Sequence, residues 1–124
     1  MDIAKYAELE NSLQKLVNII KAQPGIKKII VFGSYARKKL TENSDLDVLV
    51  VQDTDIPWYK RLTGLSRENV EVSIDMLVFT PDEFEELKTK TGSVVVEAIK
   101  EGITVYEEQS AVSAGRFKER IPII

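Results

Sequence analysis

Apolar residues follow two different spacings along the 124-residue chain, and each spacing predicts a type of element. Over residues 3–23 they recur every three or four positions, which is typical of an amphipathic helix. Pro24 and Gly25 interrupt this pattern and are expected to end the helix. Two short apolar runs follow, at 29–32 and 46–51, the second of which contains one polar residue, Asp47. Because both runs are rich in Val and Ile, they predict strands buried on both faces.

The second half of the chain alternates before it returns to a helical spacing. Residues 70–79 alternate between two sets of positions, one of them wholly apolar, which predicts a strand with one apolar face. A capping box at 80–83 then predicts a helix that continues to about residue 90. A second helix is expected at 94–100, and a short edge strand at 103–106.

Residues 58–68 lie between these halves and predict an uneven helix that Gly64 interrupts. Trp58 and Tyr59 begin this segment, and aromatic side chains of this kind can stack on a nucleotide base. Aromatic residues that flank a sheet more often pack against it. We therefore expect Trp58 and Tyr59 to pack on the sheet.

Together these elements predict an α/β fold, with a small mixed sheet of three or four strands and helices packed on it. The length, with 44% hydrophobic and 30% charged residues, suits a single domain over 1–124. Its expected parts are an N-terminal helix at 1–25, a core that carries the candidate chemistry at 26–106 and a tail at 107–124.

Composition excludes several classes of site. The chain has no Cys and no His, so disulfides, structural zinc, a thiol nucleophile and an imidazole base are all excluded. A net charge of −3 argues against a broad nucleic-acid-binding surface. No apolar run is long enough to span a bilayer, and the start of the chain lacks a signal-peptide pattern. We therefore expect no membrane association and a cytoplasmic location.

The residues with the clearest chemistry lie between the two buried strands. Gly33 and Ser34 directly follow the first strand, where a glycine allows a phosphate to approach the backbone and exposed amides can meet an anion. Asp45 and Asp47 begin the second strand, so both carboxylates project from one face of it. Two adjacent carboxylates repel each other unless a cation lies between them, and Mg²⁺ prefers such oxygen ligands. The pattern predicts a nucleoside triphosphate site with its metal.

Asp75 is the expected third carboxylate. It lies on the less apolar face of the 70–79 strand, flanked by Ile74 and Met76, and a charge in that setting needs a partner. The metal site would provide one. Two alternatives stay open, a solvated Asp75 at a strand edge or Glu71 in the same role.

A basic run, Arg37-Lys38-Lys39, follows the Gly33-Ser34 turn in a segment, 35–39, that is expected to form a short helix. Arginine and lysine can neutralise the charge of a triphosphate or of leaving pyrophosphate. Arg37 is expected to take that role. Lys38 and Lys39 are expected to face solvent.

Gly33-Ser34, the spacer 35–44 and Asp45-Leu46-Asp47 together resemble the signature of the polymerase-beta-like nucleotidyltransferase superfamily. Over about residues 26–106 the chain is similar to the minimal nucleotidyltransferases, which include MntA-type antitoxins paired with HEPN toxins. One departure is visible, because Lys38 follows Ala36-Arg37 where the family often has glycine.

The resemblance implies a polymerase-beta-like palm in which the Gly-Ser pair holds a triphosphate and the paired aspartates bind Mg²⁺. It also implies a third carboxylate on a later strand, which is the place of Asp75. Two Mg²⁺ ions would align the acceptor oxygen and the leaving oxygen on the α-phosphorus. The implied reaction transfers a nucleoside monophosphate, with ATP favoured as donor, to a hydroxyl.

Nothing after the expected palm is large enough to form an acceptor-binding domain, so a partner or a second subunit is expected to bind the acceptor. The leading hypothesis is transfer of AMP to a tyrosine of a HEPN-type toxin by this chain as its antitoxin. One alternative acceptor is a small molecule such as an aminoglycoside. The other alternative is a non-catalytic module that binds nucleotide or partner without turnover.

Overall fold

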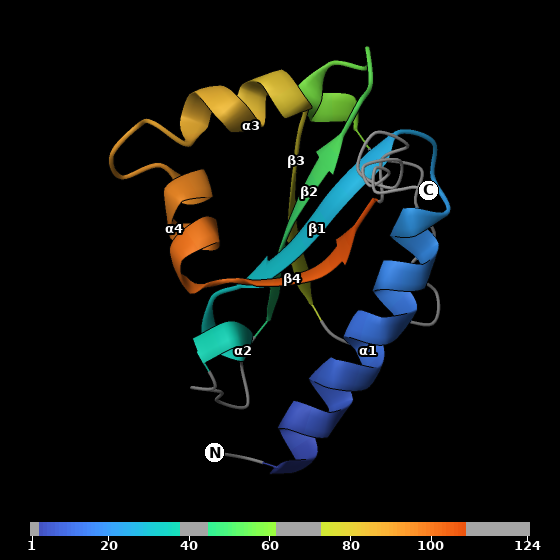
Figure 1. The fold of residues 1–124 in the computed structure, drawn as a ribbon. Helices are drawn as coiled ribbons and strands as arrows, with labels where there is room; N and C mark the ends of the chain where they lie inside the picture. Colours follow the sequence, from blue (N-terminus) through green and yellow to red (C-terminus); the bar gives the residue numbers. More distant parts are fainter. Residues whose placement is uncertain (1–2, 38–44, 62–72, 109–124) are drawn as a thin grey trace, which may run out of the picture.

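A mixed sheet forms the middle layer of the computed structural model, which describes residues 3–37, 45–61 and 73–108 (Figure 1). Within these ranges the sheet has four strands, between α1 on one face and the pair α3 and α4 on the other. The expected α/β class and the mixed sheet with packed helices are confirmed. The elements run in the order α1 (Ile3–Lys21), β1 (Ile26–Phe32), α2 (Ser34–Arg37), β2 (Leu46–Gln52), η1 (Trp58–Lys60), β3 (Ile74–Phe79), α3 (Pro81–Leu87), α4 (Val94–Glu101) and β4 (Ile103–Glu107).

The strand order β3-β2-β1-β4 decides which loops meet. β1 pairs antiparallel with both β2 and β4, whereas β3 runs parallel to β2. Because β1 runs opposite to β2 and β3, the last residues of β1 lie beside the first residues of those two strands. At this end of the sheet Asp45 directly precedes β2, and Asp47 and Asp75 are the second residues of β2 and β3.

One apolar layer lies between α1 and the sheet. The helix has apolar residues at three- and four-residue spacing, so one stripe faces the strands. The fully buried members of this cluster are Leu9, Leu16, Ile20, Ile29, Val31, Leu46, Val48 and Val50. Ile74, Met76 and Val78 of β3 pack against it, so the apolar face predicted for this strand is confirmed.

A second apolar layer covers the opposite face of the same strands. It consists of Ile30, Phe32, Leu49, Val51, Phe84, Val95 and Ala98, from β1, β2, α3 and α4. The alternate residues of β1 and β2 therefore enter two different cores. This double burial confirms the prediction that both apolar runs form strands buried on two faces.

The starts of the helices in this second layer agree with their capping residues. The Thr80 hydroxyl accepts from the Glu83 amide at 3.2 Å, and the Glu83 carboxylate accepts from the Thr80 amide at 2.9 Å. This reciprocal pair is the predicted capping box. The α3 helix ends at Leu87, a few residues earlier than expected, and Ser93 caps α4 by accepting from the Val96 amide at 3.2 Å.

The expectations for the segment after β2 were partly wrong. A single turn of 3₁₀ helix, η1, replaces the described part of the expected helix, and its remaining residues 62–68 lie outside the described ranges. Trp58 is 73% exposed and Tyr59 is 61% exposed, so these rings do not pack in the core. β3 is described from Ile74 onward, and the earlier part of the expected strand, 70–72, lies outside.

No helix among the described residues has both the length and the apolar character needed to cross a membrane.

Leu49 and Leu77 are register partners on β2 and β3, but Leu49 is fully buried and Leu77 is 40% exposed. Leu49→Ala is expected to lower the free energy of unfolding by about 2–5 kcal/mol, because it removes contacts and leaves a cavity. Leu77→Ala is expected to cost less than about 1 kcal/mol. Urea unfolding of both variants measures the difference. Equal losses would contradict the burial of β2 between two helical layers.

Candidate active site

Gly33 directly follows β1 and lies against the side chain of Asp47, another of the predicted site residues. Its φ of 76° lies in the left-handed region, which favours glycine over residues that have a Cβ. A Cβ at this position would collide with the carboxylate of Asp47. From the sequence, Gly33 is expected to leave room for a phosphate to approach the backbone. In the structure the group that occupies the space of a Cβ at Gly33 is the Asp47 side chain.

The turn continues directly into α2, which consists of one helical turn. The Arg37 amide donates to the Gly33 carbonyl at 3.0 Å and closes this turn. Tyr35 anchors it, because its buried ring stacks on Tyr6 of α1 with centroids 5.0 Å apart and planes at 7°. One turn is too short to sum to a sizeable helix dipole. Backbone amides of this first turn, including that of half-buried Ser34, are therefore the groups that could meet an anion.

Asp45, Asp47 and Asp75 gather at the same end of the sheet. Asp47 lies between Phe32 of β1 and Asp75 of β3 in the strand registers. Asp45 precedes Asp47 by two positions, so alternation along the strand directs both side chains to one face. Asp45 and Asp47 are half-buried, whereas Asp75 is exposed. The sheet thus brings together carboxylates that are far apart in the sequence.

The environment of Asp47 is unfavourable for a negative charge. Burial raises the pKa of its carboxyl group, and the nearby charges of Asp75, Asp45 and Glu97 raise it further. The positive charge of Arg37 acts in the opposite direction and lowers this pKa. A cation placed here would relieve the repulsion between these groups.

The donor set fits Mg²⁺, although it does not form a complete cage. Among the residues that the structure describes, no group of three or more acidic side chains is placed to enclose a metal ion. Mg²⁺ is usually held by one or two carboxylates, with water and substrate phosphates as its other ligands. Oxygen donors in a negative environment, next to a turn that a Cβ would fill, agree with this type of site. The alternative third carboxylate, Glu71, lies outside the described residues.

Two acidic residues of α4 border the site, and the sequence interpretation treated this helix only as scaffold. Glu97 acts on the charge of Asp47, and Glu101 accepts from Arg37 Nη1 at 3.0 Å. Arg37, predicted to contact a triphosphate, is therefore held by α4. A signal was present in the sequence, because an acidic residue at the C-terminal end of a helix opposes the helix dipole. Glu101 is the last residue of α4, where a nearby cation is favourable.

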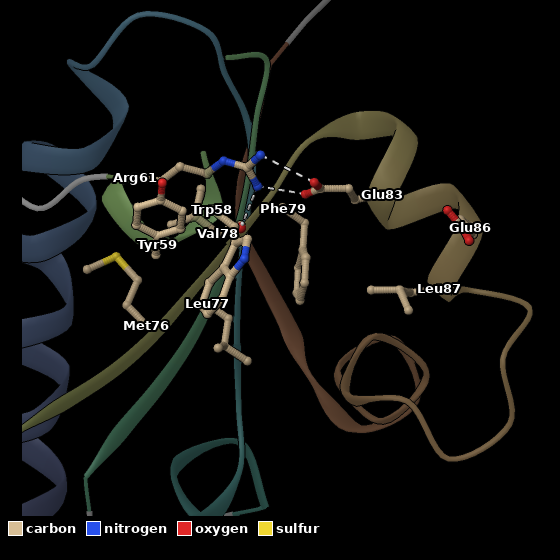
Figure 2. Close-up of a pocket in the computed structure, with 10 residues that line it drawn as sticks. All are labelled: Trp58, Tyr59, Arg61, Met76, Leu77, Val78, Phe79, Glu83, Glu86 and Leu87. Carbon is tan, nitrogen blue, oxygen red and sulfur yellow. Dashed lines mark hydrogen bonds and ion pairs between the residues drawn. The ribbon is translucent and has the colours of Figure 1, made fainter. Parts of the chain in front are cut away.

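A groove of about 520 Å³ runs along β3 (Figure 2). It is lined by Trp58, Tyr59, Arg61, Met76, Leu77, Val78, Phe79, Glu83, Glu86 and Leu87. Figure 2 shows apolar side chains along β3 and the aromatic rings from η1. None of the predicted site residues lines this groove, so it is not the predicted triphosphate site.

An ion pair between Arg61 and Glu83 forms part of the lining of this groove. The Arg61 side chain is only 7% exposed and donates to both Glu83 oxygens, at 2.6 and 3.2 Å. The same guanidinium donates to the carbonyls of Ile56 at 2.7 Å and Val78 at 3.2 Å. These bonds tie the segment after β2 to β3 and α3. They also satisfy a cation that would be costly to bury alone.

Comparison with known proteins identifies relatives of this fold and of this sequence. The family model described as Polymerase beta, Nucleotidyltransferase matches residues 14–111. Two proteins of Methanocaldococcus jannaschii, both provisionally named protein adenylyltransferases, are similar in sequence. MJ0604 is 47% identical over 51 residues, which is 40% of this chain and 51% of that protein. MJ0128 is 46% identical over 74 residues, which is 58% of this chain and 76% of that protein. The chain thus spans about half the length of the first relative and about three quarters of the second.

Two solved structures share the fold at low sequence identity. A provisionally named nucleotidyltransferase from Sulfolobus solfataricus has a TM-score of 0.61 and 18% identity, with 86% of each chain covered. A structure of the toxin–antitoxin MntA–HpeT, in a mutant form, has a TM-score of 0.50 and 13% identity, with 86% of this chain and 87% of that chain covered. At such identities the similarity concerns the fold alone.

Gly33→Ala and Gly92→Ala form a matched pair, since both glycines have a positive φ, 76° and 84°. Each substitution is expected to cost about 1–2 kcal/mol of unfolding free energy, because a Cβ is disfavoured in this region. A Cβ at Gly92 meets no atom within 4 Å, whereas one at Gly33 displaces the Asp47 carboxylate. The Asp47 carboxyl resonance in NMR spectra is therefore expected to move in Gly33→Ala and to stay unchanged in Gly92→Ala. An unchanged resonance in both variants would contradict the contact.

The Arg61–Glu83 ion pair predicts a dependence of stability on pH. The hydrogen bonds from Arg61 and from the Thr80 backbone lower the pKa of Glu83 in the folded protein. The ion pair therefore stabilises the fold above about pH 4.3, the usual pKa of glutamate, and this stabilisation is lost as the pH falls through the lowered value. The difference in unfolding free energy between wild type and Glu83→Gln is expected to shrink on acidification. Glu86→Gln, on the same helix, is the control, and a constant difference for Glu83→Gln would contradict the ion pair.

Proposed function

The chain belongs to the polymerase beta nucleotidyltransferase family, and from this membership we propose that it transfers AMP from ATP to a hydroxyl of a partner protein. One observation carries the proposal. The Gly33 turn and the Asp47 carboxylate are in direct contact at the end of the sheet, with Asp75 beside Asp47 in the next strand. A turn that suits phosphate and carboxylates that suit a metal therefore adjoin each other.

Each site residue has a distinct role in this proposal. The Gly33 and Ser34 backbone meets the triphosphate, and Arg37 lies beside it as a cation for the phosphate charge. Asp45, Asp47 and Asp75 are the carboxylates that would hold Mg²⁺, two ions in all. When bound, Mg²⁺ neutralises the triphosphate and favours ionisation of the attacking hydroxyl.

The transfer step is a displacement at phosphorus. The acceptor oxygen forms a bond to the α-phosphorus of ATP, and the bond from that phosphorus to the oxygen bridging to the β-phosphate breaks. Pyrophosphate leaves with that electron pair. Asp75 is exposed at the start of β3 and takes the hydroxyl proton as general base.

The proposed acceptor is a tyrosine of a helical HEPN-type toxin, for which this chain acts as antitoxin. Two kinds of similarity support it. The relatives that the chain matches in sequence are provisionally named protein adenylyltransferases. The toxin–antitoxin MntA–HpeT shares the fold. A partner can supply the positioning that brings an acceptor hydroxyl in line with the α-phosphorus, which lowers the barrier by several kcal/mol.

Incubation of the protein with ATP, Mg²⁺ and a HEPN-type protein encoded next to it tests the proposal. Intact-mass spectrometry is expected to show one or more AMP additions to the partner. Asp47→Asn and Asp75→Asn are expected to lower the rate at least about 100-fold, because they remove a metal ligand and a general base. Asp55→Asn, an exposed acidic residue in the loop after β2, is the matched control and is expected to keep full activity.

Labelling of a small acceptor such as an aminoglycoside in place of the partner would replace the antitoxin proposal with a small-molecule enzyme. Nucleotide binding without labelling of any acceptor would instead favour a non-catalytic module. Undiminished transfer by Asp47→Asn would contradict the assignment of the metal site.

A further inference from the structure

The ion pair between Arg37 and Glu101 joins two elements that border the candidate site from different sides. Arg37 is the last residue of α2, directly after the Gly33 turn, and Glu101 is the last residue of α4. The Arg37 Nη1 atom lies 3.0 Å from Glu101 Oε1. Its positive charge also reaches Asp47, whose pKa it lowers. Arg37 therefore interacts with a carboxylate of α4 through an ion pair and with Asp47 of the sheet through its charge.

The backbone position of Glu101 is rigidly defined by its neighbours. Gly102 follows it and packs so tightly that a Cβ would meet the Ala98 carbonyl and the Ile30 side chain. The next residue, Ile103, already pairs with Val31 of β1. The backbone next to Glu101 is thus attached to β1, the strand that precedes the Gly33 turn. From this fixed backbone position Glu101 can hold the guanidinium of Arg37 in one place.

The contribution of this ion pair to overall stability is expected to be small. The Arg37 and Glu101 side chains are 43% and 38% exposed, and exposed ion pairs contribute about 0–1 kcal/mol. The ion pair has a clearer effect on the conformation of Arg37. A free arginine side chain samples many rotamers, and the bond to Glu101 restricts them. A guanidinium has five N–H donors, so a bond to one carboxylate oxygen leaves others for a ligand.

We propose that Glu101 is a positioning residue, which holds the Arg37 guanidinium beside the Gly33 turn so that its remaining N–H donors meet the triphosphate of the substrate. The inference rests on the proposed function, since it presumes that a nucleotide triphosphate binds at this turn. It adds α4 to the site as the element that orients the phosphate-binding cation. Glu101 touches no reacting atom and acts through Arg37 alone.

This role predicts a specific pattern of nucleotide affinities in a double-mutant cycle. Arg37→Gln is expected to weaken binding of a non-hydrolysable ATP analogue roughly tenfold or more, as expected for the loss of a charge-assisted contact. Glu101→Gln is expected to weaken it roughly threefold or more, because the guanidinium is no longer held. The double variant is expected to bind no more weakly than Arg37→Gln alone, since Glu101 has no effect without its partner. In transfer assays, KM for ATP is expected to rise more than kcat falls.

Glu85→Gln is the matched control, because Glu85 of α3 is also an exposed carboxylate in an ion pair, 3.2 Å from Lys88 just after the helix. It is expected to leave nucleotide affinity unchanged. Glu101→Gln and Glu85→Gln are expected to change the urea midpoint by similar small amounts, which separates positioning from a purely structural effect.

Three results would overturn the inference. The first is an affinity of Glu101→Gln equal to that of wild type. The second is an effect of Glu101→Gln that persists at full size in the Arg37→Gln background, since Glu101 would then act independently of Arg37. Both of these leave the proposed function intact if wild type binds the analogue. The third is a failure of the wild-type protein to bind the analogue at all, which overturns the proposed function and this inference with it.

Discussion

The contact between the α-carbon of Gly33 and the carboxylate of Asp47 is the constraint on which the rest of the site depends. It exists because β1 and β2 run antiparallel, with Phe32 opposite Asp47, so the end of one strand meets the start of the other. Any side chain larger than hydrogen at position 33 would separate the turn from the carboxylate. The close packing of two strands therefore sets the distance between a group that suits phosphate and a group that suits a metal.

A carboxylate in this position needs a well-packed sheet around it and cations close to it. Leu46 and Val48, on either side of Asp47, are fully buried, which anchors the strand while the acidic group lies at its open end. Burial and neighbouring acids raise the pKa of Asp47, so the site disfavours the charge that its proposed chemistry requires. Arg37 supplies one compensating charge, and bound Mg²⁺ would supply another. The helix α4, which covers one face of the sheet, takes part in this balance of charges. Its Glu97 raises the pKa of Asp47, and its Glu101 binds Arg37.

The structure separates this site from the groove along β3. The groove is lined by apolar side chains and exposed aromatic rings, and its Arg61 is already paired with Glu83. This lining does not suit a triphosphate. Family membership accounts for the sheet and the turn. The similar solved structures share little sequence with this chain, so their similarity concerns the fold and not the roles of individual residues.

Much of the fold and part of the site follow from the sequence alone, because they depend on local patterns. Short apolar runs rich in Val and Ile identified β1 and β2, and the capping box at Thr80 and Glu83 located the start of α3. The family was also recognisable from a glycine turn and two nearby aspartates, which lie within one short stretch. These signals need no knowledge of distant neighbours.

What the sequence could not determine are contacts between segments far apart in the chain. Only the parallel register of β2 and β3 places Asp75 beside Asp47, and only the packing of α4 on β1 brings Glu101 to Arg37. The exposure of Trp58 and Tyr59 was missed for the same reason, since an aromatic residue is buried only where other elements cover it. The sequence by itself therefore determined most of the elements and the nearness of the glycine turn to the two aspartates along the chain. The tertiary structure decided which charges lie side by side, because the strand order and helix packing that join them depend on the whole chain.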